Sequence, residues 1–188
     1  MIELKKNKIY ICISNAKKGG FFSWLQRFVT GIDITHSEPI LHKDFYGQVG
    51  LSAEHSCTLE YIQRLIDNED IDVWIYEIDI GNLDAEVIEK YLVNKFIGKR
   101  YGYLQVLYFI PRRILEIVGI DTRRWWNPFK AGLLCSEICY YLFELVANKL
   151  PQDFVFELHK WKIDNFHSGD LFNLMNKYFK NNLIYKKL

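Results

Sequence analysis

The segment GLLCSEICYYL, residues 132–142, decides the expected fold, because it places a cysteine at the start of a run with helical spacing. Ile138 and Leu142 are four residues apart, and apolar positions continue beyond them, which predicts a buried helix at about 136–147. The unpaired N–H groups and the positive dipole end of such a helix stabilise a thiolate and can receive an oxyanion. Cys135 is therefore a candidate nucleophile.

A second interpretation of the same segment is purely structural. Free cysteine is among the most buried residue types, and Cys139, four residues further on, fits that description. The carboxylate of Glu137, in the first turn, interacts favourably with the helix dipole whether or not catalysis occurs. The local sequence alone leaves Cys135 open between a reactive thiolate and an inert core thiol.

Length and composition set the class of protein. The chain has 188 residues, 49% hydrophobic and 25% charged, which predicts one globular domain spanning 1–188. The formal net charge of +1 gives no large field to hold a phosphate backbone, so nucleic acid is not an expected partner. We find no signal peptide and no apolar run of about 18 residues, so we expect no membrane span. Four cysteines without a CxxC pair favour free thiols in a reducing compartment, the cytoplasm.

The pattern of apolar residues predicts a mixed α+β fold. Alternation predicts strands at 8–14, 32–41, 48–54 and 71–80, with a final strand at 154–158. Spacing of three and four predicts helices at 21–29, 85–96, 103–118 and 170–178, the third of them broken at Pro111. A loop with one helical turn is expected at 58–67. We expect an antiparallel sheet packed against the helix that carries Cys135.

A thiolate hydrolase also needs an imidazole, and the five histidines differ in context. His36 lies inside a predicted strand, on the same face as Glu38, and rigid elements place catalytic groups better than loops do. The other four fall in turns, strand ends or polar segments, where solvated surface is the default: His42, His55, His159 and His167. We therefore expect His36 to be the base.

The group that orients the imidazole is expected on the returning arm of a β-hairpin centred near Asp44. Ser52 and Glu54 share one face of that arm. Glu54 is the stronger electrostatic partner for an imidazolium, whereas Ser52 is closer to direct cross-strand register. We prefer Glu54, with Ser52 as the alternative.

Other kinds of site find little support in the sequence. The Cys and His residues do not have the short spacings of zinc sites, and the pairs His36/Glu38 and His55/Cys57 are weak signals. A Gly-rich phosphate loop and a Gly-x-Ser-x-Gly elbow are both missing. We expect no metal and no cofactor.

The order of short motifs adds a resemblance. Four segments follow one another along the chain: Thr35-His36-Ser37, Leu51-Ser52-Ala53-Glu54, Gly98-Lys99-Arg100-Tyr101-Gly102 and Leu134-Cys135-Ser136-Glu137. This order resembles the circularly permuted papain-like hydrolases of the NlpC-type superfamily, the YiiX-like branch, and the segment 166–171 is similar to that family's C-terminal motif. The sequence departs from the family at Ser52, where another polar residue is expected, and it lacks a proline before Gly169.

The resemblance implies a permuted papain-like fold with Cys135 as nucleophile, His36 as base, and Tyr101 and Ser52 near the substrate. It implies cleavage of an amide (peptide or isopeptide) or ester bond through an acyl-enzyme, in a peptide-like or acyl-containing substrate. Two alternatives stay open. One is a catalytically idle papain-like module that binds a peptide or acyl group, and the other is an acyltransferase that uses the same thioester.

Overall fold

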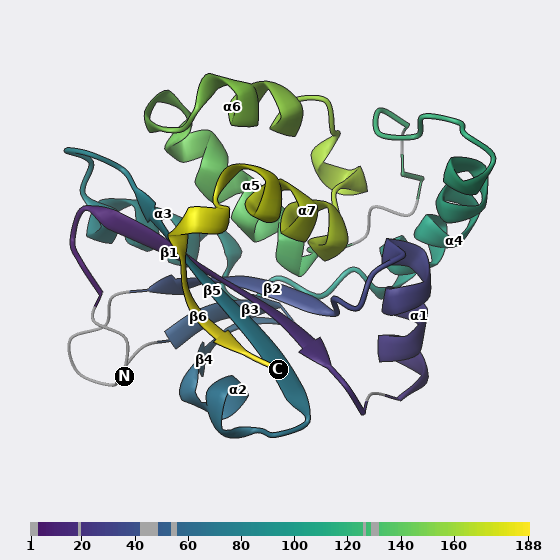
Figure 1. Ribbon diagram of the computed structural model, residues 1–188, viewed down its shortest axis with the longest axis horizontal. Coiled ribbons are helices and arrows are strands. Elements are labelled where there is room, and N and C mark those ends of the chain that lie inside the picture. Colours follow the sequence, from purple (N-terminus) through teal and green to yellow (C-terminus); the bar gives the residue numbers. More distant parts are fainter. Residues whose placement is uncertain (1–3, 19, 42–48, 54–55, 126, 129–131) are drawn as a thin grey trace.

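The structure is a computed structural model that describes residues 4–18, 20–41, 49–53, 56–125, 127–128 and 132–188. It has a mixed α+β architecture in which helices cover a six-stranded antiparallel sheet of order β4-β3-β2-β1-β5-β6 (Figure 1). The strands are β1 (Lys8–Ala16), β2 (His36–Leu41), β3 (Val49–Ala53), β4 (Cys57–Tyr61), β5 (Ile71–Asp79) and β6 (Leu183–Lys187). The α-helices are α1 (Phe21–Thr30), α2 (Gln63–Asp67), α3 (Ala85–Phe96), α4 (Tyr103–Ile117), α5 (Cys135–Leu145), α6 (Gln152–Leu158) and α7 (Ser168–Tyr178).

The central strand β1 is buried on both faces, and its side chains divide between two cores. Ile9, Ile11 and Ile13 join the large core on the side of the main helical layer. Tyr10 and Cys12 join a smaller core on the opposite face, which the short helix α2 covers. This two-residue alternation is the strand period that the sequence displays at 8–14. The predicted α+β class and antiparallel sheet are confirmed.

Helix α5 packs directly on β2. The first residue of the helix is Cys135, and the first residue of the strand is His36. The helix residues from Cys135 to Tyr140 are all buried, which explains why this stretch is apolar apart from Ser136 and Glu137. Glu137 caps its own helix, because its Oε2 accepts from the Leu134 N–H at 3.3 Å. The helix begins at Cys135, one residue earlier than the spacing predicted.

The predicted strand at 154–158 is wrong, because these residues belong to helix α6. Phe154 and Leu158 are fully buried, while Phe156 between them is 66% exposed. A strand would have placed all three side chains on one face, whereas a helix places residues four apart on one face. Pro151 at the N-cap and Asp153 in the first turn also favour a helical start.

Two further expectations are corrected by the tertiary structure. Helix α4 continues through Pro111 without a break, because the proline lies on the exposed side, where water can serve the carbonyl of Leu107. The predicted loop at 58–67 contains β4, which pairs with β3, ahead of the short helix α2. The strand β6 was not predicted, and it pairs with β5 at the edge of the sheet. Among the described residues, no helix is both long and apolar enough to cross a membrane.

The peptide that leads into α5 is held against the segment before α4. Leu133 donates its N–H to the Arg100 carbonyl at 2.9 Å and accepts from the Gly102 N–H at 3.1 Å. A Cβ at Gly132 would lie 2.6 Å from backbone atoms of Gly102, which is closer than non-bonded atoms can approach. Gly132 is therefore required for this close approach of two backbones.

We expect Gly132→Ala to lower the free energy of unfolding by about 1–3 kcal/mol, because the two backbone segments must separate. The displacement should also slow alkylation of Cys135, three residues away. Urea denaturation and the rate of iodoacetamide labelling measure the two effects. Gly20→Ala is the matched control, because a Cβ there meets nothing within 4 Å. Equal behaviour of the two variants would contradict the close-approach explanation.

Candidate active site

Cys135 is the first residue of α5, and the strand-like residues before it deliver its thiol into the core. Its side chain is 3% exposed. Leu134 is the N-cap in extended conformation, so the first N–H groups of the helix have no intrahelical acceptor. The thiol therefore lies beside a group of backbone donors and the positive end of the helix dipole.

Two serines from other elements contact this thiol. The Cys135 Sγ lies 3.2 Å from the Oγ of Ser168, the first residue of α7. Ser168 Oγ lies in turn 3.0 Å from the Oγ of Ser37 on β2. The backbone N–H of Ser37 also donates to the sulfur. The start of α7 and the start of β2 thus both supply hydrogen bonds at the N-terminus of α5.

His36 begins β2 and brings its ring to the same place. Its Nε2 lies 3.2 Å from the Ser52 Oγ on β3 and 3.7 Å from the Glu38 Oε2. The ring also forms a hydrogen bond with Cys135. The structure therefore brings together the cysteine, the histidine and Ser52 that the sequence singled out.

The pKa of the Cys135 thiol is low for a buried cysteine. Burial raises it, but the charge of His36, its hydrogen bond and the hydrogen bonds from Ser168 and Ser37 outweigh burial. Together they lower the pKa from 9.0 to about 7. A substantial fraction of the thiol is ionised at neutral pH.

The pKa of His36 moves in the opposite direction. Burial lowers it, but the Cys135 charge and hydrogen bond, together with Glu38, raise it well above the usual 6.5. The two shifts share one cause, since the thiolate and the imidazolium stabilise each other. The pair therefore favours the ionised form that a thiol nucleophile requires.

The other three cysteines lack such a partner and become less acidic. Burial raises the pKa of Cys57 to about 11 and raises those of Cys12 and Cys139 well above 9.0. All three are buried core residues. Cys139 is thus a buried core thiol, as its position in the sequence indicated. Among the four cysteines, Cys135 alone has a lowered pKa.

A cavity of about 20 Å³ adjoins the thiol, with room for about one water molecule. Tyr101 lines it from the segment before α4, and its hydroxyl accepts a hydrogen bond from Gln26 Nε2 at 3.3 Å. Burial, and next the nearby Cys135 charge, raise the pKa of Tyr101 well above 10.0. Tyr101 is thus a neutral, buried member of the cavity wall, to which Cys135 also contributes.

His167 was expected on the surface, and this prediction is wrong. Its ring is buried, lines the same cavity and packs edge-on against Phe109 at 5.3 Å between centroids. His167 is the N-cap of α7, and its Nδ1 accepts from the Asp170 N–H at 3.2 Å. A cap of this kind is usually Ser, Thr, Asp or Asn, so the sequence offered little signal for it.

The protonation of His167 follows from these contacts. Burial and the charge of Arg112 lower the pKa of the ring well below 6.5, so it is neutral at physiological pH. Nδ1 also lies 3.2 Å from the Asp170 Oδ2, so either nitrogen of the neutral ring can carry its proton. The Nε2 atom has no hydrogen-bond partner among the described residues. The cavity wall therefore carries a buried ring nitrogen to which no described residue forms a hydrogen bond.

The group expected to orient the His36 ring was preferred as Glu54, with Ser52 as the alternative. Glu54 lies outside the described residues. Ser52 contacts the His36 ring directly, and the nearest described carboxylate is Glu38 on the same strand as His36. Glu38 is 1% exposed, and neither of its oxygens has a hydrogen-bond partner within the described ranges. Its place on the same strand face as His36, two residues further on, was the sequence signal for this contact.

Comparisons with known proteins assign no family to the chain. No protein-family model matches the chain, and no curated protein matches it in sequence. Within the described ranges, no group of three or more His, Cys, Asp or Glu side chains is placed to hold a metal ion.

We expect iodoacetamide to modify Cys135 well before Cys12, Cys57 and Cys139, because only its thiolate is populated near neutral pH. The labelling rate should rise with pH through an apparent pKa of about 7, since deprotonation creates the nucleophile. Peptide mapping by mass spectrometry after timed labelling measures each site.

His36→Ala should raise the apparent pKa of Cys135 and slow its labelling at pH 7 by about tenfold or more, because the charge partner is lost. His159→Ala is the matched control, since this side chain is half exposed and pairs with Glu144. Similar rates at all four cysteines in the native protein would contradict the activated pair.

Proposed function

We propose that the chain is a thiol hydrolase that cleaves an amide or ester bond through an acyl-enzyme on Cys135, with His36 as its base. The observation that carries the proposal is the lowered pKa of a buried cysteine at a helix N-terminus, beside a histidine whose pKa is raised. Burial alone would shift both values the other way. Buried groups tuned against their solvation in this manner mark catalytic sites.

In the first half-reaction, the Cys135 thiolate attacks the carbonyl carbon and forms a C–S bond. The developing oxyanion is received by the N–H groups at the start of α5. Since Ser52 and Glu38 face the Nε2 of His36, we assign its Nδ1 to the sulfur and the leaving group. Nδ1–H then protonates the leaving amine or alcohol as the C–N or C–O bond breaks.

In the second half-reaction, a water molecule replaces the leaving group beside His36. Nδ1 takes one proton from the water as its oxygen attacks the thioester carbon. The C–S bond breaks, the carboxylic acid leaves, and the thiolate is restored beside the imidazolium. Glu38 and Ser52 hold the ring and favour its charged form throughout.

His167 supplies a further donor in this scheme. We place the ring proton on Nε2, which has no hydrogen-bond partner within the described chain and is buried in the wall of the cavity beside Cys135. Leaving a buried N–H unpaired is unfavourable by about 1–3 kcal/mol, so an acceptor brought by the substrate would be favoured. We assign this acceptor to the acyl oxygen or to the group next to it.

The arrangement also supports a circularly permuted papain-like fold of the NlpC type. A papain-like site needs a cysteine at the start of a helix packed on an antiparallel sheet that carries the histidine. Here α5 and β2 have those roles, and the histidine strand precedes the cysteine helix along the chain. This order and the motifs around His36 and Cys135 are the support for that assignment.

We expect short-chain p-nitrophenyl esters to acylate Cys135, giving a thioester that intact-protein mass spectrometry detects and hydroxylamine removes. Cys135→Ser should abolish the thioester, because the serine hydroxyl is not ionised by His36. His36→Ala should lower the acylation rate by about 10²-fold or more, since both the ion pair and the proton donor are lost.

Release of the free acid separates hydrolysis from its alternatives. Transfer of the acyl group to an added amine in preference to water would indicate an acyltransferase. Failure of every ester and amide probe to acylate a thiol that still reacts with iodoacetamide would contradict the proposal and indicate a binding module. Cys139→Ser serves as the control, because Cys139 has no catalytic role in this scheme.

His167→Asn tests the proposed donor without removing the cap of α7. The Asn side-chain oxygen can accept from the Asp170 N–H as Nδ1 does, but nothing replaces Nε2–H. We expect kcat for ester hydrolysis to fall by about 10²-fold, the usual loss of one oxyanion donor, while the iodoacetamide rate of Cys135 stays unchanged. Equal losses in both rates would instead indicate a structural role.

A further inference from the structure

One face of helix α4 lies against the segment that leads into α7, and two of its three side chains there are polar. Gln105, Phe109 and Arg112 are spaced four and three residues apart, and all three are buried. Gln105 Nε2 donates to the Asp164 carbonyl at 3.3 Å, and the Phe109 ring packs edge-on against His167. This face therefore binds the segment through polar groups as well as through apolar packing.

The Arg112 guanidinium is a charged group in the core, and the residue is only 2% exposed. Its Nε donates to the Glu116 Oε1 at 2.7 Å, and its Nη2 lies 3.4 and 3.2 Å from the two carboxylate oxygens of Asp170. Its Nη1 donates to the backbone carbonyl of Asn165. The guanidinium carbon also lies 4.7 Å from the centroid of the Trp161 ring. One side chain thus joins α4 to the residues on both sides of the start of α7.

Stability alone does not account for an arginine at this position. Removing a guanidinium from water is costly, and well-packed apolar side chains of similar volume are often as stable as a buried ion pair. An apolar side chain cannot supply the rigid set of N–H donors that reaches several acceptors at once. The arginine therefore sets the position of α7 relative to α4 more narrowly than apolar packing would.

The start of α7 is also where the Cys135 thiol meets one of its hydrogen-bond partners. Asp170, which Arg112 contacts, accepts from the His167 N–H at 3.1 Å and so fixes the first turn of α7. Ser168 lies between these two residues in that turn, and its Oγ is 3.2 Å from the Cys135 Sγ. Hydrogen bonds weaken steeply when their geometry is lost, so this contact depends on where the first turn is held.

We propose that Arg112 is a positioning residue that fixes the start of α7, so that the Ser168 hydroxyl donates to the Cys135 thiolate. The proposal rests on the thiol chemistry proposed for Cys135. Arg112 lies outside the set of described residues that line the cavity, so its effect passes through α7. Helix α5 holds the same segment from its own side, because the Ser136 Oγ donates to the Phe166 carbonyl at 2.7 Å.

Arg112→Lys is the principal test, because it keeps the positive charge while a single ammonium cannot hold all of these acceptors in the same geometry. We expect the apparent pKa of Cys135, measured by iodoacetamide labelling across pH, to rise by about one unit as the hydrogen bond from Ser168 weakens. Labelling at about pH 6 should then slow by up to about tenfold. The variant retains the titratable groups around the thiol: His36, Glu38, Tyr101, Glu137, Cys139 and His167.

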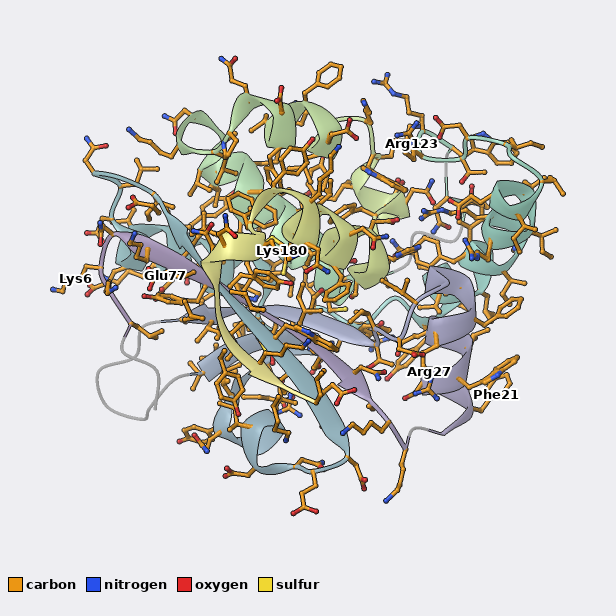
Figure 2. The ribbon with its side chains drawn as sticks, viewed as in Figure 1. Lys6, Phe21, Arg27, Glu77, Arg123 and Lys180 are labelled. Carbon is orange, nitrogen blue, oxygen red and sulfur yellow. The ribbon has the colours of Figure 1, made fainter. Side chains whose placement is uncertain are left out.

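Two further variants locate the effect. Ser168→Ala should give a similar rise, and Arg112→Lys should add little in the Ser168→Ala background, because both changes then act on one hydrogen bond. Arg123→Lys is the matched control and should leave the pH profile unchanged. Arg123 lies at the periphery of the molecule (Figure 2), where it pairs with Asp121 and lies over the same Trp161 ring at 5.9 Å.

An Arg112→Lys profile that matches the native one would overturn the proposal, and so would an undiminished shift in the Ser168→Ala background. A native profile without an apparent pKa near 7 would overturn the thiol chemistry as well, so the two failures are distinguishable. Urea denaturation establishes that each variant is folded. Asp170→Asn breaks the same ion pair and should give the same rise if the lysine variant does not fold.

Discussion

The candidate site depends on a buried pair of opposite charges, the Cys135 thiolate and the His36 imidazolium. Either charge alone would be strongly disfavoured in the core, and burial by itself shifts the pKa of both groups toward their neutral forms. The ionised pair is stabilised because the two opposite charges are adjacent and because each also has hydrogen-bond partners. Glu38 adds a carboxylate next to the imidazolium, and Ser168 adds a hydroxyl next to the sulfur.

The sheet and the helices α5 and α7 bring the members of this pair and their hydrogen-bond partners together. Residues at the start of β2, α5 and α7 converge, although they are separated by about 100 and 30 positions along the chain. The N-termini of the two helices bring positive dipole ends and unpaired donors toward the sulfur. The close backbone approach at Gly132 holds the segment that leads into Cys135 against residues 101–102.

The same helical layer divides into two kinds of surface. Helices α5 and α7 are largely buried and hold the reactive groups, whereas α1 and α4 bury one apolar stripe and expose another. An exposed stripe contributes nothing to the core and lowers solubility, so its retention calls for a partner. The reactive groups thus lie in the buried part of the layer, apart from its exposed apolar side chains.

Local sequence determined the α+β class, most strand and helix positions, and the selection of Cys135 and His36, because hydrophobic periodicity and helix-start signals are properties of short segments. Strand β6 was decided by its pairing with β5, which lies far away along the chain. The burial of Phe154 in helix α6 was decided by its packing against Phe143 and Phe179. The burial of His167 and the approach of Ser168 to Cys135 are likewise tertiary. No local pattern records them, since each depends on elements that meet only when the sheet and helices assemble.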